Sequence, residues 1–463
     1  IPAFICEKCD EPLMDSDSLE KVISILDKEG VDAWFEKPAD QLMENKAACS
    51  KCGGTSFAKS RDILDVWFDS GVSHSVALEA NPKLAWPADL YLEGSDQHRG
   101  WFHTSLLESV GVRSEAPYKQ VLTHGYVVDG AGKKMSKTLG NVIPPQKIID
   151  QYGAEILRLW VSSEDYREDI RLSNEILSRL TEAYRKIRNT IRFMLGNISD
   201  LNITEGYVPF GERLELDRVI MIRFHKMCQK IEKAFSEYEF HVFYHSMHNF
   251  CVLDLSAFYL DIIKDRVYTW PKDSLGRRSA QSTLLDLTHG SLRLIAPVLS
   301  FTAEEAWASL GQVAAKEPSV HMAKAPDTNL ADSNETLHGE WERIIQIRGE
   351  VSAALEIERR EKRIAHSLDA RLEISAFQAD YDLLEKRKEE LPFIFITSQA
   401  ALVESPVEGG AIFRSEKIPG LTVKVAKAEG EKCSRCWNYS VTVGANNEHP
   451  AICSRCAGHL SGE

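Results

Sequence analysis

The 463-residue sequence lacks the features of a membrane or secreted protein. It has no apolar run near the roughly 20 residues that a membrane-spanning helix needs. Its first residues, IPAFICEKCD, show neither the basic start nor the apolar stretch of a secretory signal. An excess of positive charge is also lacking, since the formal net charge is −14. Because neutralisation of phosphates dominates sequence-blind binding, this acidity argues against a general nucleic-acid coat protein and leaves room only for a local basic track.

The cysteines are not scattered as they are in a secreted disulfide scaffold. Eight of the ten fall into four Cys-x-x-Cys pairs, which indicates metal binding in a reducing compartment and predicts a cytoplasmic protein. Two pairs, Cys433/Cys436 and Cys453/Cys456, are separated by 16 residues, the spacing of a structural four-cysteine zinc site. Two disulfides are the alternative. Because the 33 residues of 431–463 bury little core, zinc would supply most of their folding energy.

The other two pairs lie near the beginning of the chain. Cys6/Cys9 and Cys49/Cys52 are separated by 39 residues and are candidates for a second four-cysteine zinc site. Between them, residues 18–30 carry apolar side chains at helical spacing. A lost or partial site is the alternative interpretation.

The pattern along the chain predicts an α/β part, then an all-α bundle, a small mixed α/β region and a zinc ribbon. The expected parts are a cysteine-pair insertion at 1–60, an α/β part at 61–172, a helical bundle at 173–311, a linker at 312–337, a helix with a small α/β region at 338–430, and the ribbon at 431–463.

Strands alternate with helices in 61–172, which implies a parallel sheet whose ligands lie at the carboxyl ends of the strands. In this part we expect strands at 89–94 and 120–128, and helices at 97–110, from Pro145 and at 154–163. In the later parts we expect helices at 217–238, 240–268 and 341–362, a capping-box helix start at Thr302 and Glu305, and strands at 371–375, 393–397 and 421–425.

A glycine-flanked loop at 130–141, GAGKKMSKTLGN, follows the second of these strands. It gathers Lys133, Lys134 and Lys137 with two hydroxyl side chains in an otherwise acidic chain. A mobile, cationic loop rich in donors suits a phosphate chain whose charge changes during a reaction. A solvated hairpin tip is the alternative.

The stretch EGSDQHRGW at 93–101 follows the first strand and combines carboxylates, an amide and an aromatic ring. Such carboxylates can accept hydrogen bonds from ribose hydroxyls or an ammonium group, while Trp101 and the upstream Trp67 would wall an apolar pocket. Helix N-capping is the alternative for Asp96, and core packing for Trp101. On a helix, Arg185, Arg188 and Arg192 share one face, which fits either a phosphate-contacting track or a solvated face.

Together these segments resemble one family, the bacterial-type isoleucyl-tRNA synthetases of class I. The lysine loop is similar to the KMSKS signature, with Thr138 in place of the usual Ser. LEGSDQHRGWF, DVWFDSG and YGAEILRLW resemble the nucleotide-binding half of the family. FYLDIIKDRVY and LSFTAEEAW resemble its tRNA-binding helical domain, and CSRCW…CSRC resembles its zinc ribbon.

The resemblance implies a Rossmann-type catalytic part that activates isoleucine with ATP and Mg²⁺ and transfers it to tRNA(Ile), in an enzyme that is a monomer at full length. It implies that Lys134 and Lys137 grip the triphosphate, with Lys137 as the ATP contact, and that Glu93 contacts the isoleucyl-adenylate. The residues that would line the ribose and the ammonium group are Gly94, Asp96 and Gln97, and those that would form the isoleucine side-chain pocket are Trp67 and Trp101.

Two family parts are not found in the sequence: a His-x-Gly-His motif and a large inserted editing domain. We expect both to precede Ile1, and we expect this chain alone not to activate isoleucine. A non-catalytic tRNA-binding module is one alternative function, and the related valyl-tRNA synthetase is another.

Overall fold

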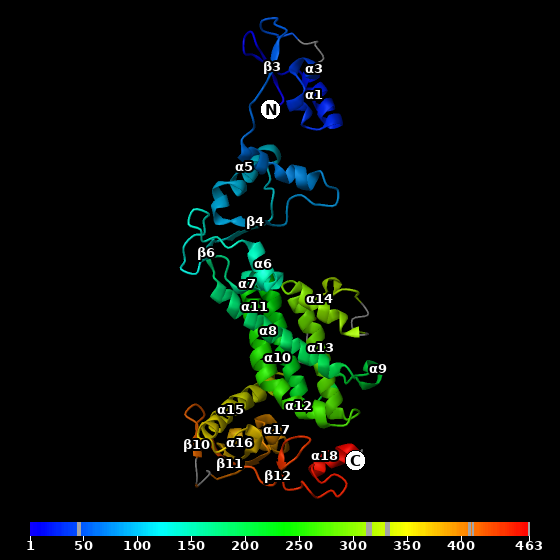
Figure 1. The fold of residues 1–463 in the computed structure, drawn as a ribbon, viewed down its shortest axis with the longest axis vertical. Coiled ribbons are helices and arrows are strands. Elements are labelled where there is room, and N and C mark those ends of the chain that lie inside the picture. Colours follow the sequence, from blue (N-terminus) through cyan, green and yellow to red (C-terminus); the bar gives the residue numbers. More distant parts are fainter. Residues whose placement is uncertain (44–47, 312–316, 329–333, 406–408, 410–411, 462–463) are drawn as a thin grey trace. The chain divides into compact units, whose positions relative to one another are not determined.

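The computed structural model describes residues 1–43, 48–311, 317–328, 334–405, 409 and 412–461 (Figure 1). They form two compact units, Ile1–Tyr126 and Val127–Glu463, and each is considered by itself. Parts of the predicted linker, 312–316 and 329–333, lie outside the described residues. No helix in the described ranges combines the length and apolarity that a membrane crossing requires.

The first unit begins with a small antiparallel sheet in the order β2-β1-β3, packed against helices. Cys6 of β1 pairs with Phe57 of β3, so the sheet places the first cysteine pair beside the second. Asp15 accepts a hydrogen bond from the Ser18 amide and caps α1, which confirms the predicted helix. The elements are β1 (Phe4–Cys6), β2 (Pro12–Leu13), α1 (Ser16–Glu29), α2 (Ala33–Glu36), α3 (Ala39–Met43) and β3 (Phe57–Lys59).

The rest of this unit holds a parallel strand pair, β4 (Tyr91–Gly94) with β5 (Val121–His124). Between them run a 3-10 turn, Ser95–Arg99, and α5 (Trp101–Arg113); α4 (Val66–Gly71) and a π-helical turn, Ser75–Glu79, precede them. The strand predicted as one piece at 120–128 is two strands, because the chain leaves the extended ladder at Gly125 and Tyr126.

The second unit opens with β6 (Val127–Asp129), which pairs in parallel with β7 (Ile170–Leu172). Their connection contains the lysine loop, α6 (Pro145–Tyr152) and α7 (Ala154–Ser163). Pro145 occupies the first position of α6, where its missing N–H costs nothing. The predicted helices at these positions are confirmed.

A bundle of helices follows and contains most of the hydrophobic core of this unit (Figure 1, green). Its elements are α8 (Asn174–Ile198), α9 (Ile203–Gly206), α10 (Glu215–Ser236), α11 (Phe240–Asn249), a π-helix (Phe250–Tyr259), α12 (Leu260–Thr269), α13 (Leu275–Ile295) and α14 (Ser300–Ala308). The capping box predicted at Thr302 and Glu305 is wrong. Glu155 of α7 instead accepts hydrogen bonds from the amides of Phe301 and Thr302, both at 2.9 Å.

A buried network around one ion pair joins four elements of the bundle: α10, the π-helix, α12 and α13. Arg266 of α12 donates two hydrogen bonds, at 2.9 and 3.0 Å, to the fully buried carboxylate of Asp217 on α10. The Tyr259 hydroxyl (2.7 Å) and the Ser279 hydroxyl (2.5 Å) of α13 donate to the same carboxylate. Because each carboxylate oxygen has its partners, the charge is tolerated in the core.

Arg266→Met is expected to lower the free energy of unfolding by about 3–5 kcal/mol, because it leaves the Asp217 carboxylate buried without its charge partner. The measurement is urea denaturation of the chain. Arg179→Met is the matched control, since Arg179 pairs with Glu175 at an exposed position on α8 and should contribute at most about 1 kcal/mol. Equal losses in the two variants would contradict this account of the network.

After the bundle, α15 (Glu335–Arg360) packs against a four-stranded sheet in the order β10-β11-β8-β9. Its strands are β8 (Ala370–Ser375), β9 (Gln399–Leu402), β10 (Ile412–Arg414) and β11 (Thr422–Lys427), with α16 (Gln378–Glu385) and α17 (Leu391–Phe395) between β8 and β9. The strand predicted at 393–397 is wrong. A short helix begins there at Leu391 with Pro392 in its first turn, and Ile396 ends it with a left-handed φ of 56°.

The final segment, β12 (Glu431–Lys432), β13 (Tyr439–Ser440) and α18 (Ser454–Ser461), docks on the bundle and on the small sheet. Arg455 forms an ion pair with Asp265 of α12 at 2.7 Å. Arg435 donates to the Thr269 carbonyl at 3.1 Å, and the Ser398 hydroxyl accepts from the Tyr439 amide at 2.7 Å. These contacts fix the position of the cysteine-bearing ribbon, residues 431–461.

Candidate functional site

The lysine loop is a closed turn between β6 and α6. Gly132 and Gly140 have φ values of 81° and 65°, in the left-handed region that favours glycine. Lys134 forms an antiparallel bridge to Val128, which turns the chain back along β6. The loop therefore has a defined path between its two glycines.

A clamp of two side chains, Asp129 and Asn141, closes this loop. One oxygen of Asp129 accepts from the amides of Ala131 (3.0 Å) and Lys133 (2.9 Å), and the other accepts from the Asn141 side-chain amide (2.9 Å). Asn141 in turn accepts from the Ser136 amide at 3.0 Å. The hydrogen bond from Asn141, followed by that from the Lys133 amide, holds the pKa of Asp129 below its usual range, so the clamp stays ionised at neutral pH.

Met135 packs against the core of the second unit, while the lysines on both sides of it are exposed. Lys137 has no ion-pair or hydrogen-bond partner for its ammonium group among the described residues. An anchored loop with an uncommitted cation can act on a phosphate without first breaking an existing ion pair. The sequence predicted the lysines, but it did not predict the clamp.

In the first unit, the candidate residues 93–97 lie directly after β4. A Cβ atom on Gly94 would lie only 2.6 Å from the Asp96 carboxylate, so the close approach of Asp96 requires glycine. Glu93 is exposed and accepts from the Gly94 amide at 3.0 Å. Asp96 caps neither the 3-10 turn nor α5, so the N-capping alternative for it is wrong.

Gln97, Trp67 and Trp101 come together around Gly100. Gln97 accepts from the Trp101 amide at 3.0 Å, and the Trp67 ring lies against Gly100, where a Cβ would meet it at 2.8 Å. Trp101 stacks on Tyr91 with ring centroids 4.1 Å apart and donates its indole N–H to the Ser70 carbonyl at 3.0 Å. Trp101 is half-buried and Trp67 is 46% exposed, so part of each residue remains accessible to solvent.

The arginines of α8 are mostly engaged by acids. Arg185 pairs with Glu182, and Arg188 pairs with Glu305 of α14 at 3.5 Å. Among the described residues Arg192 has no ion-pair or hydrogen-bond partner for its guanidinium group, so of these three arginines it alone has no acid paired with it there. The face is therefore closer to a solvated, ion-paired surface than to a continuous basic track.

The cysteine pairs converge into two clusters, and in each cluster the four sulfurs lie within 4.8 Å of one another. In the first cluster the Sγ atoms of Cys6 and Cys52, and those of Cys9 and Cys49, are 3.6 Å apart. In the second, Cys436 and Cys453 are separated by 3.9 Å. These distances exceed a disulfide bond, and every cysteine is free. They match the roughly 3.8 Å edge of a tetrahedron with Zn–S bonds of about 2.3 Å.

An apolar cleft of about 730 Å³ lies between the ribbon, α12 and α17. Trp437 and Tyr268 are both 61% exposed and line it, and Arg455 lies over the Phe393 ring at 5.3 Å. Trp437 stands within the CSRCW motif, and the motif alone predicted no role for it. The available signal was a large aromatic residue in a segment too short to bury it.

Three family models match successive parts of the chain. Residues 1–173 match tRNA synthetases class I (I, L, M and V), residues 217–374 match the anticodon-binding domain of tRNA ligase, and residues 430–457 match a zinc finger found in FPG and IleRS. These matches support a class I catalytic-like part, a helical anticodon-binding part and a zinc-finger-like cysteine cluster.

Curated relatives match along the whole chain. Isoleucine–tRNA ligase of Syntrophotalea carbinolica is 51% identical over 463 residues, which is 100% of this chain and 49% of the relative. Isoleucine–tRNA ligase of Geobacter sulfurreducens is 49% identical over 458 residues, 99% of this chain and 49% of the relative. The chain therefore spans about half the length of the curated relatives it matches.

Among solved structures, the chain resembles the ternary complex of LeuRS, tRNA and LeuAMS from Agrobacterium radiobacter. The TM-score is 0.51 at 16% identity, and the match covers 88% of this chain and 50% of that chain. At this identity the likeness concerns the fold alone.

Proposed function

Because the chain belongs over its whole length to the isoleucine–tRNA ligase family, we propose that it supplies the phosphate-binding loop and the tRNA-binding parts of an enzyme that activates isoleucine with ATP and joins it to tRNA(Ile). The observation that carries the proposal is the clamped lysine loop, with an exposed and uncommitted cation at Lys137. A protein that only binds tRNA has no use for such a loop.

In the proposed reaction, the isoleucine carboxylate attacks the α-phosphorus of ATP, and pyrophosphate leaves. Negative charge grows on the phosphate oxygens as the bond to the leaving group breaks. Lys134 and Lys137 hold cations where that charge develops, which stabilises the transition state more than the ground state. The Asp129–Asn141 clamp keeps the loop backbone in place while this happens.

The residues at the end of β4, in the first unit, would bind the ribose and the amino acid of the adenylate. Glu93, Asp96 and Gln97 offer oxygen acceptors for ribose hydroxyls and the amino acid's ammonium group, and Gly94 leaves room beside them. Trp67 and Trp101 would form the pocket for the isoleucine side chain. The parallel pair β4–β5 supports a Rossmann-type arrangement of this part. An apolar pocket discriminates one methylene by only about 1–3 kcal/mol, so valine would require a separate editing step.

Both cysteine clusters fit Zn²⁺, because each gathers four sulfurs within 4.8 Å of one another, with sulfur–sulfur distances of 3.6 Å in the first and 3.9 Å in the second that are close to those of a tetrahedral site. Cys433, Cys436, Cys453 and Cys456 would hold the ion of the ribbon. The remaining four, Cys6, Cys9, Cys49 and Cys52, would hold the second. With four thiolates no coordination position is left for a substrate, so both sites would be structural.

The apolar cleft beside the ribbon would bind an unpaired base of the tRNA. Exposed Trp437 and Tyr268 offer ring faces, and the guanidinium groups of Arg435 and Arg455 stand at the same cleft. RNA bases that leave the stack are commonly held by aromatic and guanidinium planes in this way.

Trp437→Ala is expected to weaken binding of a tRNA(Ile) transcript to the zinc-loaded chain about tenfold, since one stacked base contributes about 1–3 kcal/mol. Fluorescence anisotropy with the labelled transcript measures the affinity. The matched control is Phe301→Ala, which removes a 70% exposed aromatic ring on α14, outside the cleft. An unchanged affinity in Trp437→Ala would remove the cleft from the proposal.

The same binding assay distinguishes the isoleucine enzyme from the alternative valine enzyme. Preference of the chain for tRNA(Ile) over the valine tRNA is the expected result. The reverse preference would favour the valyl enzyme.

A further inference from the structure

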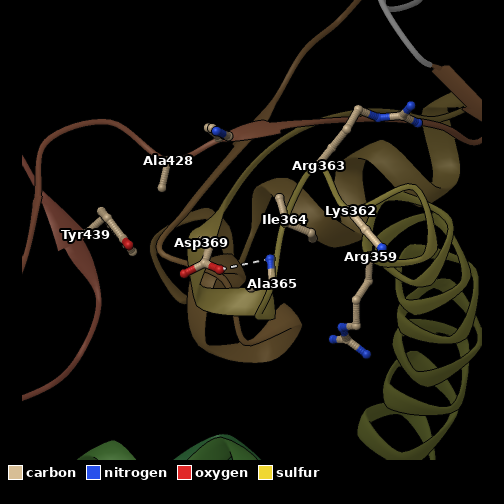
Figure 2. A pocket seen from close by; sticks show the side chains of 9 residues that line it. Arg359, Lys362, Arg363, Ile364, Ala365, Asp369, Ala428 and Tyr439 are labelled. Carbon is tan, nitrogen blue, oxygen red and sulfur yellow. Dashed lines mark hydrogen bonds between the residues drawn. The ribbon is translucent and has the colours of Figure 1, made fainter.

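A second hollow, of about 620 Å³, lies between the end of α15, β11 and the ribbon. Figure 2 shows Arg359 and Lys362 at the end of α15 on one side and Tyr439 with Ala428 on the other, with Asp369 between them. Lys427, the last residue of β11, also lines it. The end of α15 and the end of β11, which are far apart in sequence, therefore bring cations to one place, and the ribbon adds Tyr439.

Two of these cations are uncommitted. Lys362 and Lys427 are exposed, and neither ammonium group has an ion-pair or hydrogen-bond partner among the described residues. Arg359, at the same hollow, is by contrast paired with an acid, Glu356, at 2.6 Å. Two cations without counterions at one hollow leave positive charge available to an anionic ligand.

The acids at the hollow are already occupied. Asp369 accepts from the amides of Ala365 (3.1 Å) and His366 (2.7 Å), which shape the turn after α15. Glu358 lies behind the lining residue Arg363, is buried and accepts two hydrogen bonds from it. The hydrogen bonding from Arg363 holds the pKa of the Glu358 carboxyl below its usual range. These carboxylates fix the walls of the hollow and do not neutralise Lys362 or Lys427.

Lys362 has a backbone conformation that is unfavourable for any residue with a side chain. It follows the end of α15 with a φ of 57°, in the left-handed region where helix ends usually have glycine. A lysine at this position costs conformational energy in the folded state. The cost is consistent with a side chain that is kept for binding and not for stability.

The position of the hollow indicates which anion it takes. Tyr439 lines both this hollow and the apolar cleft proposed to bind a base. Because Tyr439 borders both cavities, an RNA strand with a base in the cleft would have its neighbouring phosphodiesters within reach of the hollow. We infer that Lys362 and Lys427 bind backbone phosphates of the RNA strand whose base occupies the cleft. This inference rests on the proposed function, because it needs the chain to bind tRNA.

The test compares Lys362→Gln/Lys427→Gln with the wild-type, zinc-loaded chain. Binding of a labelled tRNA(Ile) transcript is measured by anisotropy at several KCl concentrations. Loss of two phosphate contacts should raise the dissociation constant about tenfold and reduce the slope of log K against log salt by about 1.4–1.8. Lys386→Gln/Lys388→Gln is the matched control: it removes the same charge near α16, where both lysines are paired with acids.

A second variant separates binding from stability. Lys362→Gly should bind tRNA more weakly while its thermal midpoint stays the same or rises, because glycine relieves the left-handed backbone. If the Lys362 side chain had a purely structural role, Lys362→Gly would instead lower both the tRNA affinity and the thermal midpoint.

Several outcomes would overturn the inference. An unchanged affinity and salt slope in the double variant would do so, as would an equal loss in the control. Saturable binding of inorganic phosphate that depends on the two lysines, with unchanged tRNA binding, would assign the hollow to a small free anion. If the wild-type chain itself binds no tRNA, the proposed function fails, which is a result distinct from the other three.

Discussion

Lys137→Ala is expected to lower the rate of isoleucine activation by about 10²- to 10³-fold, the loss typical of removing one preorganised group that stabilises transition-state charge. The assay is isoleucine-dependent exchange of pyrophosphate into ATP by a full-length isoleucine–tRNA ligase that carries these residues. Lys137 is exposed and, within the described ranges, its ammonium group is uncommitted. No rearrangement of the fold is expected to accompany its removal.

The kinetic pattern should distinguish this role from simple ATP binding. If Lys137 acts on charge that develops in the transition state, kcat and kcat/KM for ATP fall together and KM changes little. A rise in KM alone would mean that the lysine binds ATP equally in the ground state. Lys137→Arg should recover part of the rate, because the guanidinium group keeps the positive charge but is planar and larger than the ammonium group.

Lys133→Ala is the matched control for this prediction. Lys133 is exposed in the same loop, and only its backbone amide takes part in the clamp, through the bond to Asp129. The variant removes the same charge and leaves the clamp intact. Its rate of isoleucine activation should therefore fall much less than that of Lys137→Ala. Equal losses would show that the loop acts through its total charge and not through a placed cation.

The sequence predicted features that short patterns determine. Cysteine spacing predicted two four-sulfur clusters, because each Cys-x-x-Cys pair forms on its own tight turn. Amphipathic periodicity predicted the bundle, since each helix must bury one face. The strand predicted at 393–397 failed because Pro392 sets a helical φ that overrides the β-propensity of the residues after it.

Features that depend on contacts across the chain could not be predicted in this way. Glu155 replaces a local capping box although it is 147 residues from Thr302. The cleft at Trp437 exists because Arg435 reaches Thr269, 166 residues away. The Asp129–Asn141 clamp is nearer in sequence, but no pattern of apolar residues marks it. Each of these results from tertiary packing, which propensity and periodicity do not describe.

Cys433→Ser is expected to remove one of two zinc ions from the chain and to unfold the ribbon. Structural zinc contributes about 10–16 kcal/mol of binding energy in small domains, and the ribbon has a core of only a few side chains to replace it. Because the ribbon forms one wall of the apolar cleft, its loss should also weaken tRNA binding by about tenfold or more. Zinc content is measured by atomic emission, and affinity by anisotropy.

Cys6→Ser supplies a control with the same chemistry at the other cluster. Cys6 is as buried as Cys433, and both belong to clusters of four sulfurs, so each variant should lower the zinc content by one ion. Cys6 lies in the first unit, whereas the cleft is built from α12, α17 and the ribbon in the second. Cys6→Ser should therefore keep its tRNA affinity. An equal loss of affinity in both variants would mean that zinc acts through general stability, and a Cys433→Ser chain that keeps both ions would mean that the ribbon sulfurs do not hold zinc.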